Sequence, residues 1–151
     1  SVFELREDWI VLSVTLDLDA ADAAELSATA TGILNIRNEK YPPTMRCAGS
    51  IFKNLMLNDL PAAVRAELPE RAVREGKVPS AYFLELAGAK GMVEGGVRVA
   101  TYHANLIFNE GGGTAAQVRT LIEELKRHVR EKFGFELEEE VQFIVPFAAM
   151  R

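Results

Sequence analysis

Apolar and polar residues alternate from Trp9 to Leu18, where every second residue from Ile10 onward is isoleucine, leucine or valine. A period of two is typical of a strand with one covered face. Asp19 can then cap a helix that continues to about Ile36, although Gly32 weakens the helical pattern. The beginning of the chain therefore predicts one strand followed by one helix.

Prolines interrupt the hydrophobic pattern in the middle of the chain. Pro61 and Pro69 prevent one continuous helix between Leu57 and Glu75, so two short helical pieces are expected there. The further elements expected in this region are an irregular stretch over residues 48–54, a helix over residues 80–87 that Gly88 ends, and strands over residues 97–100 and 106–108.

The clearest helical pattern begins after Thr114. Thr114 and Gln117 have the spacing of a capping box, and apolar residues then recur at every third or fourth position as far as Phe133. Charged residues occupy the opposite face of this helix. The pattern predicts a long amphipathic helix that covers a core.

An alternating segment over residues 137–145 predicts a final strand. Within it, Glu139 would face away from Glu138 and Glu140, and a carboxylate that faces inward would need a partner. Helices and strands are mixed along the chain without repeats. The sequence therefore predicts an α+β fold, in which a small mixed sheet packs against helices.

Composition narrows the possible functions. The chain has 151 residues, of which 48% are hydrophobic, and a formal net charge of −5. This charge argues against binding to nucleic acid or to an anionic membrane, because both need a basic surface. The single cysteine and the lack of a long apolar run favour a cytoplasmic protein. The start at Ser1, close to an apolar stretch, suggests a piece of a longer protein.

Basic residues gather in one region of this acidic chain. Four basic residues and one acidic residue lie between Arg37 and Lys53. They suit a compact anion such as a diphosphate, although a solvated loop would show the same pattern. Ser50 lies in this region next to Gly49. Its hydroxyl could donate a proton to a strong base, or it could simply occupy a turn.

Two polar segments further along could also bind a ligand. His103 and Asn105 would project from the same face of an extended segment and could bind an oxygen atom together. A metal site is not expected with only two histidines in the chain. The run of glycines at 111–113 is interpreted as a turn into the capped helix, because it matches no phosphate-binding loop.

Several short segments, in this order, resemble the MurB family of UDP-N-acetylenolpyruvylglucosamine reductases. The start, SVF, resembles the end of the family's YRxSxF segment. The other similar segments are AGSIFKN at 48–54, GAKG at 88–91, GG at 95–96, HAN at 103–105 with Asn109, GTA at 113–115, and FG at 133–134 followed by LEEEV at 137–141. The similarity covers nearly the whole chain.

The resemblance implies a flavoenzyme of peptidoglycan synthesis. In this family NADPH reduces FAD, and the flavin passes hydride to UDP-N-acetylglucosamine enolpyruvate, which becomes UDP-N-acetylmuramate. Ser50 matches the family's proton-donating serine, and Glu140 matches its catalytic glutamate. The substrate contacts that the resemblance implies are Arg37, Lys40, Asn54, Lys90 and His103. FAD and NADPH would act in the full-length enzyme, and neither is expected to bind to this chain alone.

The resemblance also implies three parts of the chain. Residues 1–18 would form the terminal strand of a preceding flavin-binding domain, residues 19–136 the C-terminal substrate-binding domain, and residues 137–151 a strand that carries Glu140. Unpaired strands at both ends would permit a strand-exchanged homodimer. Two functions stay open: part of the reductase, or a stand-alone, non-catalytic module that binds a UDP-sugar or another protein.

Overall fold

The computed structural model describes residues 9–144 and divides the chain into two compact units, Ser1–Pro42 and Pro43–Arg151. The division falls after Pro42, whereas the sequence suggested boundaries after residues 18 and 136. The three functional parts drawn from the family resemblance stay predictions.

The first unit contains one regular element, helix α1 (Ala23–Lys40), among its described residues. The carboxylate of Asp22 accepts a hydrogen bond from the Glu25 N–H at 2.8 Å and so caps the helix. The predicted helix is confirmed, but its cap is Asp22 rather than Asp19. No residue of α1 is buried.

The strand predicted over Trp9–Leu18 is wrong, because residues 9–18 form no strand. Their alternating apolar side chains are exposed, and the side chain of Leu12 is 92% accessible. A strand needs a neighbour for its backbone hydrogen bonds, and this unit has no other strand among its described residues. The strand-exchanged homodimer, which required this strand, stays an untested prediction.

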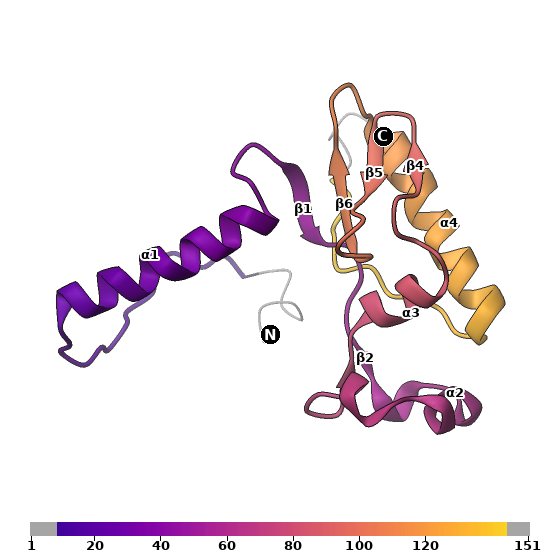
Figure 1. Cartoon of the computed structure of the whole chain (residues 1–151), viewed down its shortest axis with the longest axis horizontal. Helices are drawn as coiled ribbons and strands as arrows, with labels where there is room; N and C mark the ends of the chain where they lie inside the picture. Colours follow the sequence, from indigo (N-terminus) through magenta and orange to yellow (C-terminus); the bar gives the residue numbers. More distant parts are fainter. Residues whose placement is uncertain (1–8, 145–151) are drawn as a thin grey trace. The chain divides into compact units, whose positions relative to one another are not determined.

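The second unit is built around a four-stranded antiparallel sheet in the order β1-β6-β5-β4 (Figure 1). Its strands are β1 (Arg46–Ser50), β4 (Val93–Glu94), β5 (Val97–Val99) and β6 (Leu106–Asn109). A second pair joins β2 (Leu55–Met56) to β3 (Lys77–Val78), also antiparallel. The predicted α+β fold with a small sheet is confirmed, although every pairing is antiparallel rather than mixed.

Helices cover the sheet and form the core with it. The long helix α4 (Ala115–Phe133) packs beside β4 and α3 (Figure 1), and Thr114 and Gln117 form the predicted capping box. The buried side chains of α4 join those of the strands, with Phe83 at 1% exposure. The shorter helices are η2 (Leu57–Asp59), α2 (Ala62–Glu67), η3 (Glu70–Ala72) and α3 (Ser80–Leu86).

The prediction of a final strand over residues 137–145 is wrong as far as residue 144; Val145 lies outside the described residues. Within 137–144 only an isolated antiparallel bridge forms, between Glu139 and Phe52. The irregular stretch expected over residues 48–54 is partly wrong as well, since β1 extends as far as Ser50. These two segments form the framework of the candidate site.

Candidate active site

An extra residue in β1 lies just before Ser50. Cys47 pairs with Phe108 and Ser50 pairs with Leu106, so β1 advances three residues while β6 advances two. Such a bulge re-aims the strand. It contains Gly49, whose φ of 85° a side chain would disfavour. Ser50 is thereby placed, exposed, at the end of β1.

Three loops meet at this same end of the sheet. β1 and β5 both run antiparallel to β6, so the end of β1, the start of β6 and the end of β5 lie together. His103 belongs to the turn that joins β5 to β6. Lys90 precedes Gly91, whose N–H donates to the Val99 carbonyl at the end of β5 (3.1 Å). The topology therefore brings Ser50, His103 and Lys90 to one end of the sheet.

Backbone hydrogen bonds hold Glu140 close to the end of β1. The Glu140 N–H donates to the Ile51 carbonyl at 2.8 Å, and the Lys53 N–H donates to the Glu138 carbonyl at 2.9 Å. Glu140 is thus held opposite the residue that follows Ser50, although the two are far apart in sequence. Asn54, directly after Lys53, is exposed beside this pairing.

His103 has a defined hydrogen-bonding role. Its Nδ1 accepts a hydrogen bond from the Asn105 N–H at 3.3 Å. In the neutral ring the proton must then sit on Nε2, which is left as a donor. The structure therefore supports a hydrogen-bonding role for His103.

The predicted pairing of His103 with Asn105 as two ligand-binding side chains is wrong. Asn105 is only 4% exposed, and its amide is directed at the backbone of residues 51–52. The reason is that the buried start of β6 has to satisfy polar groups in the core. This contact was not predicted from the sequence, where a polar residue immediately before the apolar run 106–108 was its only signal.

The lysines and arginines considered for the site belong to two different units. Lys53 forms an ion pair with Glu138, and Lys90 forms one with Glu85 at 2.6 Å, so each ammonium group already has a carboxylate beside it. Arg37 and Lys40 lie on the last turn of α1 and belong to the first unit. The group at the end of the sheet is therefore made from the second unit alone.

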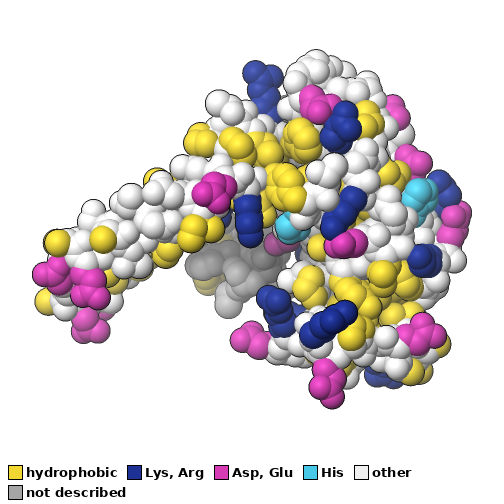
Figure 2. Space-filling view, viewed as in Figure 1, with side chains coloured by type: hydrophobic (Ala, Val, Ile, Leu, Met, Phe, Trp, Pro, Cys, Tyr) yellow, Lys and Arg dark blue, Asp and Glu magenta, His cyan; other side chains and the backbone are white. Residues whose placement is uncertain are grey.

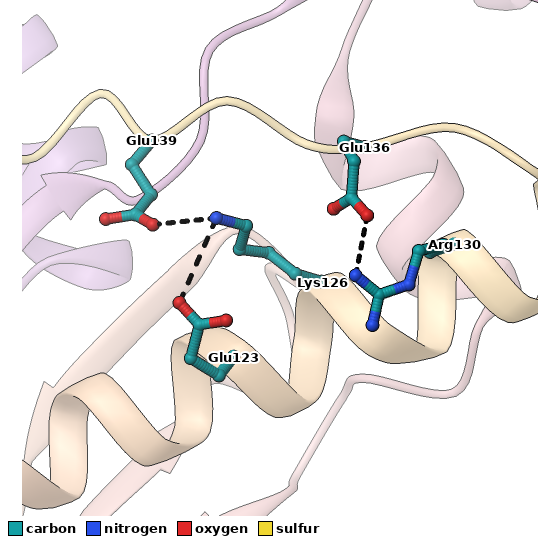
Figure 3. Close-up of polar contacts among 5 residues, drawn as sticks. All are labelled: Glu123, Lys126, Arg130, Glu136 and Glu139. Carbon is teal, nitrogen blue, oxygen red and sulfur yellow. Dashed lines mark hydrogen bonds and ion pairs between the residues drawn. The ribbon is translucent and has the colours of Figure 1, made fainter.

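Glu139 is the inward-facing carboxylate of the acidic run, and it has the partner that the sequence required. It accepts a hydrogen bond from Lys126 of α4 at 3.0 Å (Figure 3). This hydrogen bond is the main cause that raises the pKa of Lys126, while partial burial opposes it and nearby carboxylates add to it. Figure 3 also shows Arg130 bound to Glu136 of the same segment. The segment that carries Glu140 is thus anchored to α4.

The glycine loop before α4 does not fit a flavin phosphate group. Two of its three glycine amides are already used: the Asn109 Oδ1 accepts hydrogen bonds from the N–H groups of Gly111 (2.8 Å) and Gly113 (3.1 Å). The interpretation of this loop as a turn into the capped helix is confirmed.

Three cavities are found in the second unit. One, of about 360 Å³, is a cleft between α2, α3 and the end of α4, where Figure 2 shows hydrophobic side chains gathered. Two others, of about 340 and 350 Å³, lie along β1 and α4 and share Ala48, Ile51 and Val118. None of these three is lined by the seven predicted site residues. A common cavity for those residues stays a prediction.

Residues 9–144 contain neither a candidate membrane-spanning helix nor a candidate metal-binding cluster. No helix in this part of the chain is long and apolar enough to cross a membrane. No group of three or more histidine, cysteine, aspartate or glutamate side chains in it is arranged to hold a metal ion.

Comparison with known proteins identifies the protein family. Residues 41–144 match the family model described as the C-terminal domain of UDP-N-acetylenolpyruvoylglucosamine reductase, and the chain belongs to this family. A crystal structure of the reductase MurB from Thermus caldophilus is 25% identical, with a TM-score of 0.50 over 84% of this chain and 38% of that one.

Individual relatives bear the same name. UDP-N-acetylenolpyruvoylglucosamine reductase of Solibacter usitatus is 57% identical over 144 residues, which are 95% of this chain and 46% of that protein. A protein of that name from Bacillus licheniformis is 31% identical over 95% of this chain and 67% of its own length. The chain spans about half the length of the first of these.

Proposed function

We propose that this chain is the substrate-binding part of a reductase that converts UDP-N-acetylglucosamine enolpyruvate to UDP-N-acetylmuramate for peptidoglycan synthesis in the cytoplasm. The observation that carries the proposal is the pairing of residues 51–53 with residues 138–140. It places Glu140 opposite the residue after Ser50, at the end of the sheet that Lys90 and His103 also reach.

The proposed role of Ser50 is to protonate the substrate. In the whole enzyme, reduced FAD, replenished by NADPH, would supply hydride to the enolpyruvyl group. The resulting enolate is a strong base, so an exposed serine hydroxyl can serve as the acid. The alkoxide that remains needs stabilising neighbours. Glu140, held beside Ile51, would help to position the intermediate.

The remaining predicted residues would hold the substrate. His103 would donate a hydrogen bond from Nε2, and Asn54 would offer its exposed amide. Lys90 would bind a negatively charged group, for which it would have to exchange or share its ion pair with Glu85. Arg37 and Lys40 of the first unit are proposed as further contacts. The flavin itself would be held by parts of the longer relatives that this chain does not span.

Ser50→Ala in the full-length protein tests this role. We expect the rate of substrate reduction to fall by about 100-fold or more, the usual contribution of a general acid. Reduction of the flavin by NADPH should be nearly unchanged, because the hydroxyl acts only on the sugar substrate. Stopped-flow absorbance at the flavin band separates the two half-reactions.

Cys47→Ala is the matched control, since Cys47 is exposed on the same strand three residues earlier. It should leave both half-reactions unchanged. Normal substrate reduction by Ser50→Ala would refute the proposed role of Ser50. Equal losses in both half-reactions would refute it too, because they would indicate general damage to the protein.

A further inference from the structure

The backbone pairing with β6 stops soon after Ser50: the Ile51 N–H still donates to the Asn105 carbonyl, just before β6, at 3.1 Å. β1 ends at Ser50, yet Ile51 and Phe52 continue into the core at 2% and 1% exposure. Their backbone groups are therefore buried and need hydrogen bonds. On one side the pairing with residues 138–140 supplies them, through Ile51 O and Lys53 N.

On the other side Asn105 supplies them, through its backbone carbonyl, which accepts from the Ile51 N–H at 3.1 Å, and through its side chain. The Asn105 Oδ1 accepts from the N–H groups of Ile51 (3.2 Å) and Phe52 (2.9 Å), and its Nδ2 donates to the Phe52 carbonyl at 2.8 Å. Nδ2 also donates to Ser80 Oγ at 2.8 Å, and Ser80 Oγ donates in turn to the Phe52 carbonyl at 3.2 Å. Ser80 is 0% exposed.

Only an asparagine suits this position. An amide has two acceptor lone pairs and two N–H donors, and here all four are used. Aspartate would turn an acceptor and a buried charge toward the Phe52 carbonyl. An apolar side chain would leave Phe52 N–H without this partner, which is costly in a buried site. No buried side-chain nitrogen or oxygen in the described part of the chain is left unpaired.

We propose that Asn105, with Ser80 beside it, is a positioning residue that fixes the backbone after Ser50 and so aims the Ser50 hydroxyl at the substrate. We call the hydrogen bonds of Asn105 and Ser80 to residues 51–52 the clamp. The clamp also holds Ile51 against Glu140, because the Ile51 carbonyl accepts from the Glu140 N–H while the Ile51 N–H is bound to Asn105. Ser50 and Glu140 are thus both held through the backbone of Ile51. The inference rests on the proposed role of Ser50, and it assigns Asn105 no contact with substrate.

The test is Asn105→Ala in the full-length protein with its flavin. A displacement of about 1 Å in a reacting group can cost about 100-fold in rate, and we expect reduction of the enolpyruvyl substrate to slow by that order. The KM for the UDP-sugar and the rate of flavin reduction by NADPH should change little. The solvent deuterium isotope effect on substrate reduction should increase, because proton delivery becomes the slow step.

Asn109→Ala is the matched control. Asn109 is the last residue of β6, the strand that Asn105 directly precedes, and its amide likewise binds the backbone of a loop, through Gly111 N, Gly113 N and Gly113 O. It should leave the isotope effect and both half-reactions unchanged at a temperature where the variant is folded. Slowing of substrate reduction in both variants alike would overturn the positioning role, as would an unchanged isotope effect in Asn105→Ala.

Ser80→Ala covers the case in which Asn105→Ala does not fold, since it removes only the Ser80 hydrogen bonds. It should produce a smaller change in the same direction, and no change would contradict the inference. Failure of the two proposals can be told apart. If Ser50→Ala abolishes substrate reduction while the folded clamp variants are normal, the clamp inference alone fails; if Ser50→Ala is normal, the proposed function fails.

Discussion

Helices α1 and α4 have 18 and 19 residues, and both begin with a side-chain cap, yet they are stabilised differently. In α4, Leu121, Leu125 and Val129 are buried against the sheet and α3. In α1 no residue is buried, and Ile33 is 62% exposed. An isolated helix of this length is marginal in water, because most helix stability in proteins comes from packing. A cap fixes where a helix begins, whereas burial of its apolar side chains determines how stable the helix is.

The first unit as a whole shows the same contrast with the second. Its apolar residues, from Ile10 and Leu12 to Leu26 and Ile33, are exposed in the structure, although their number would suit a covered surface. The second unit, by contrast, buries a continuous core that includes three aromatic rings stacked edge to face around Phe83. The two units should therefore respond very differently to loss of apolar side chains.

The largest expected effect is the loss of a core ring. Phe83→Ala in the 151-residue chain should lower the free energy of unfolding of the second unit by about 3–5 kcal/mol. Ile33→Ala in α1 should change it by less than about 0.5 kcal/mol, because that side chain is exposed. Urea unfolding followed by amide protection in α4 measures both. Similar losses in the two variants would mean that α1 is covered in solution.

Replacing one glycine by alanine in each unit should give a second, smaller contrast, because the two changes in stability should have opposite signs. A Cβ on Gly96 would lie 2.5 Å from the Gly113 nitrogen and 2.8 Å from the Gly111 carbonyl, whereas a Cβ on Gly32 would meet nothing within 4 Å. Gly96→Ala should therefore cost about 1–3 kcal/mol through backbone displacement. Gly32→Ala should stabilise α1 by about 0.5–1 kcal/mol.

Thermal unfolding for Gly96→Ala and helical circular dichroism for Gly32→Ala are the measurements. The Gly32 variant should show more helix signal than the parent chain. A destabilised Gly32 variant would contradict the exposed environment of α1, and a neutral Gly96 variant would contradict the close approach of the two loops.

The sequence was sufficient for elements whose signals are local. The capping box at Thr114, the helix that follows Pro79 and the division of residues 57–75 into short helices were all predicted, because turns and caps depend on neighbouring residues. The strands predicted over residues 9–18 and 137–145 do not form among the described residues. Alternation over Trp9–Leu18 shows that a strand is possible, but it says nothing about whether a partner strand is available.

For the candidate site, the sequence indicated candidate residues but not the contacts that hold them. Resemblance indicated Ser50 and Glu140, and the acidic run predicted one inward carboxylate. The clamp of Asn105 on Phe52 could not be foreseen, because it joins residues 53 positions apart.

The smallest expected effect concerns the two ion pairs that anchor this last segment to α4 in the second unit. Lys126 and Glu139 are each less than one quarter exposed, whereas Arg130 and Glu136 are each more than half exposed. Glu139→Gln should lower the free energy of unfolding by about 1 kcal/mol, since a charged hydrogen bond is lost from a partly buried place. Glu136→Gln should give no measurable change, as is usual for exposed pairs.

The pH dependence of stability sharpens this last prediction. The pKa of Lys126 is raised in the folded chain above its ordinary value of 10.5, chiefly by its hydrogen bond to Glu139. The unfolded state therefore loses this proton first as pH rises, and the contribution of the pair is complete below pH 10.5 and disappears as pH passes the folded pKa. Urea unfolding at pH 8 and at pH 11 should show a difference between Glu139→Gln and the parent chain that shrinks at the higher pH. A difference that is the same at both values would show that Glu139 stabilises the segment by packing and not through the charge of Lys126.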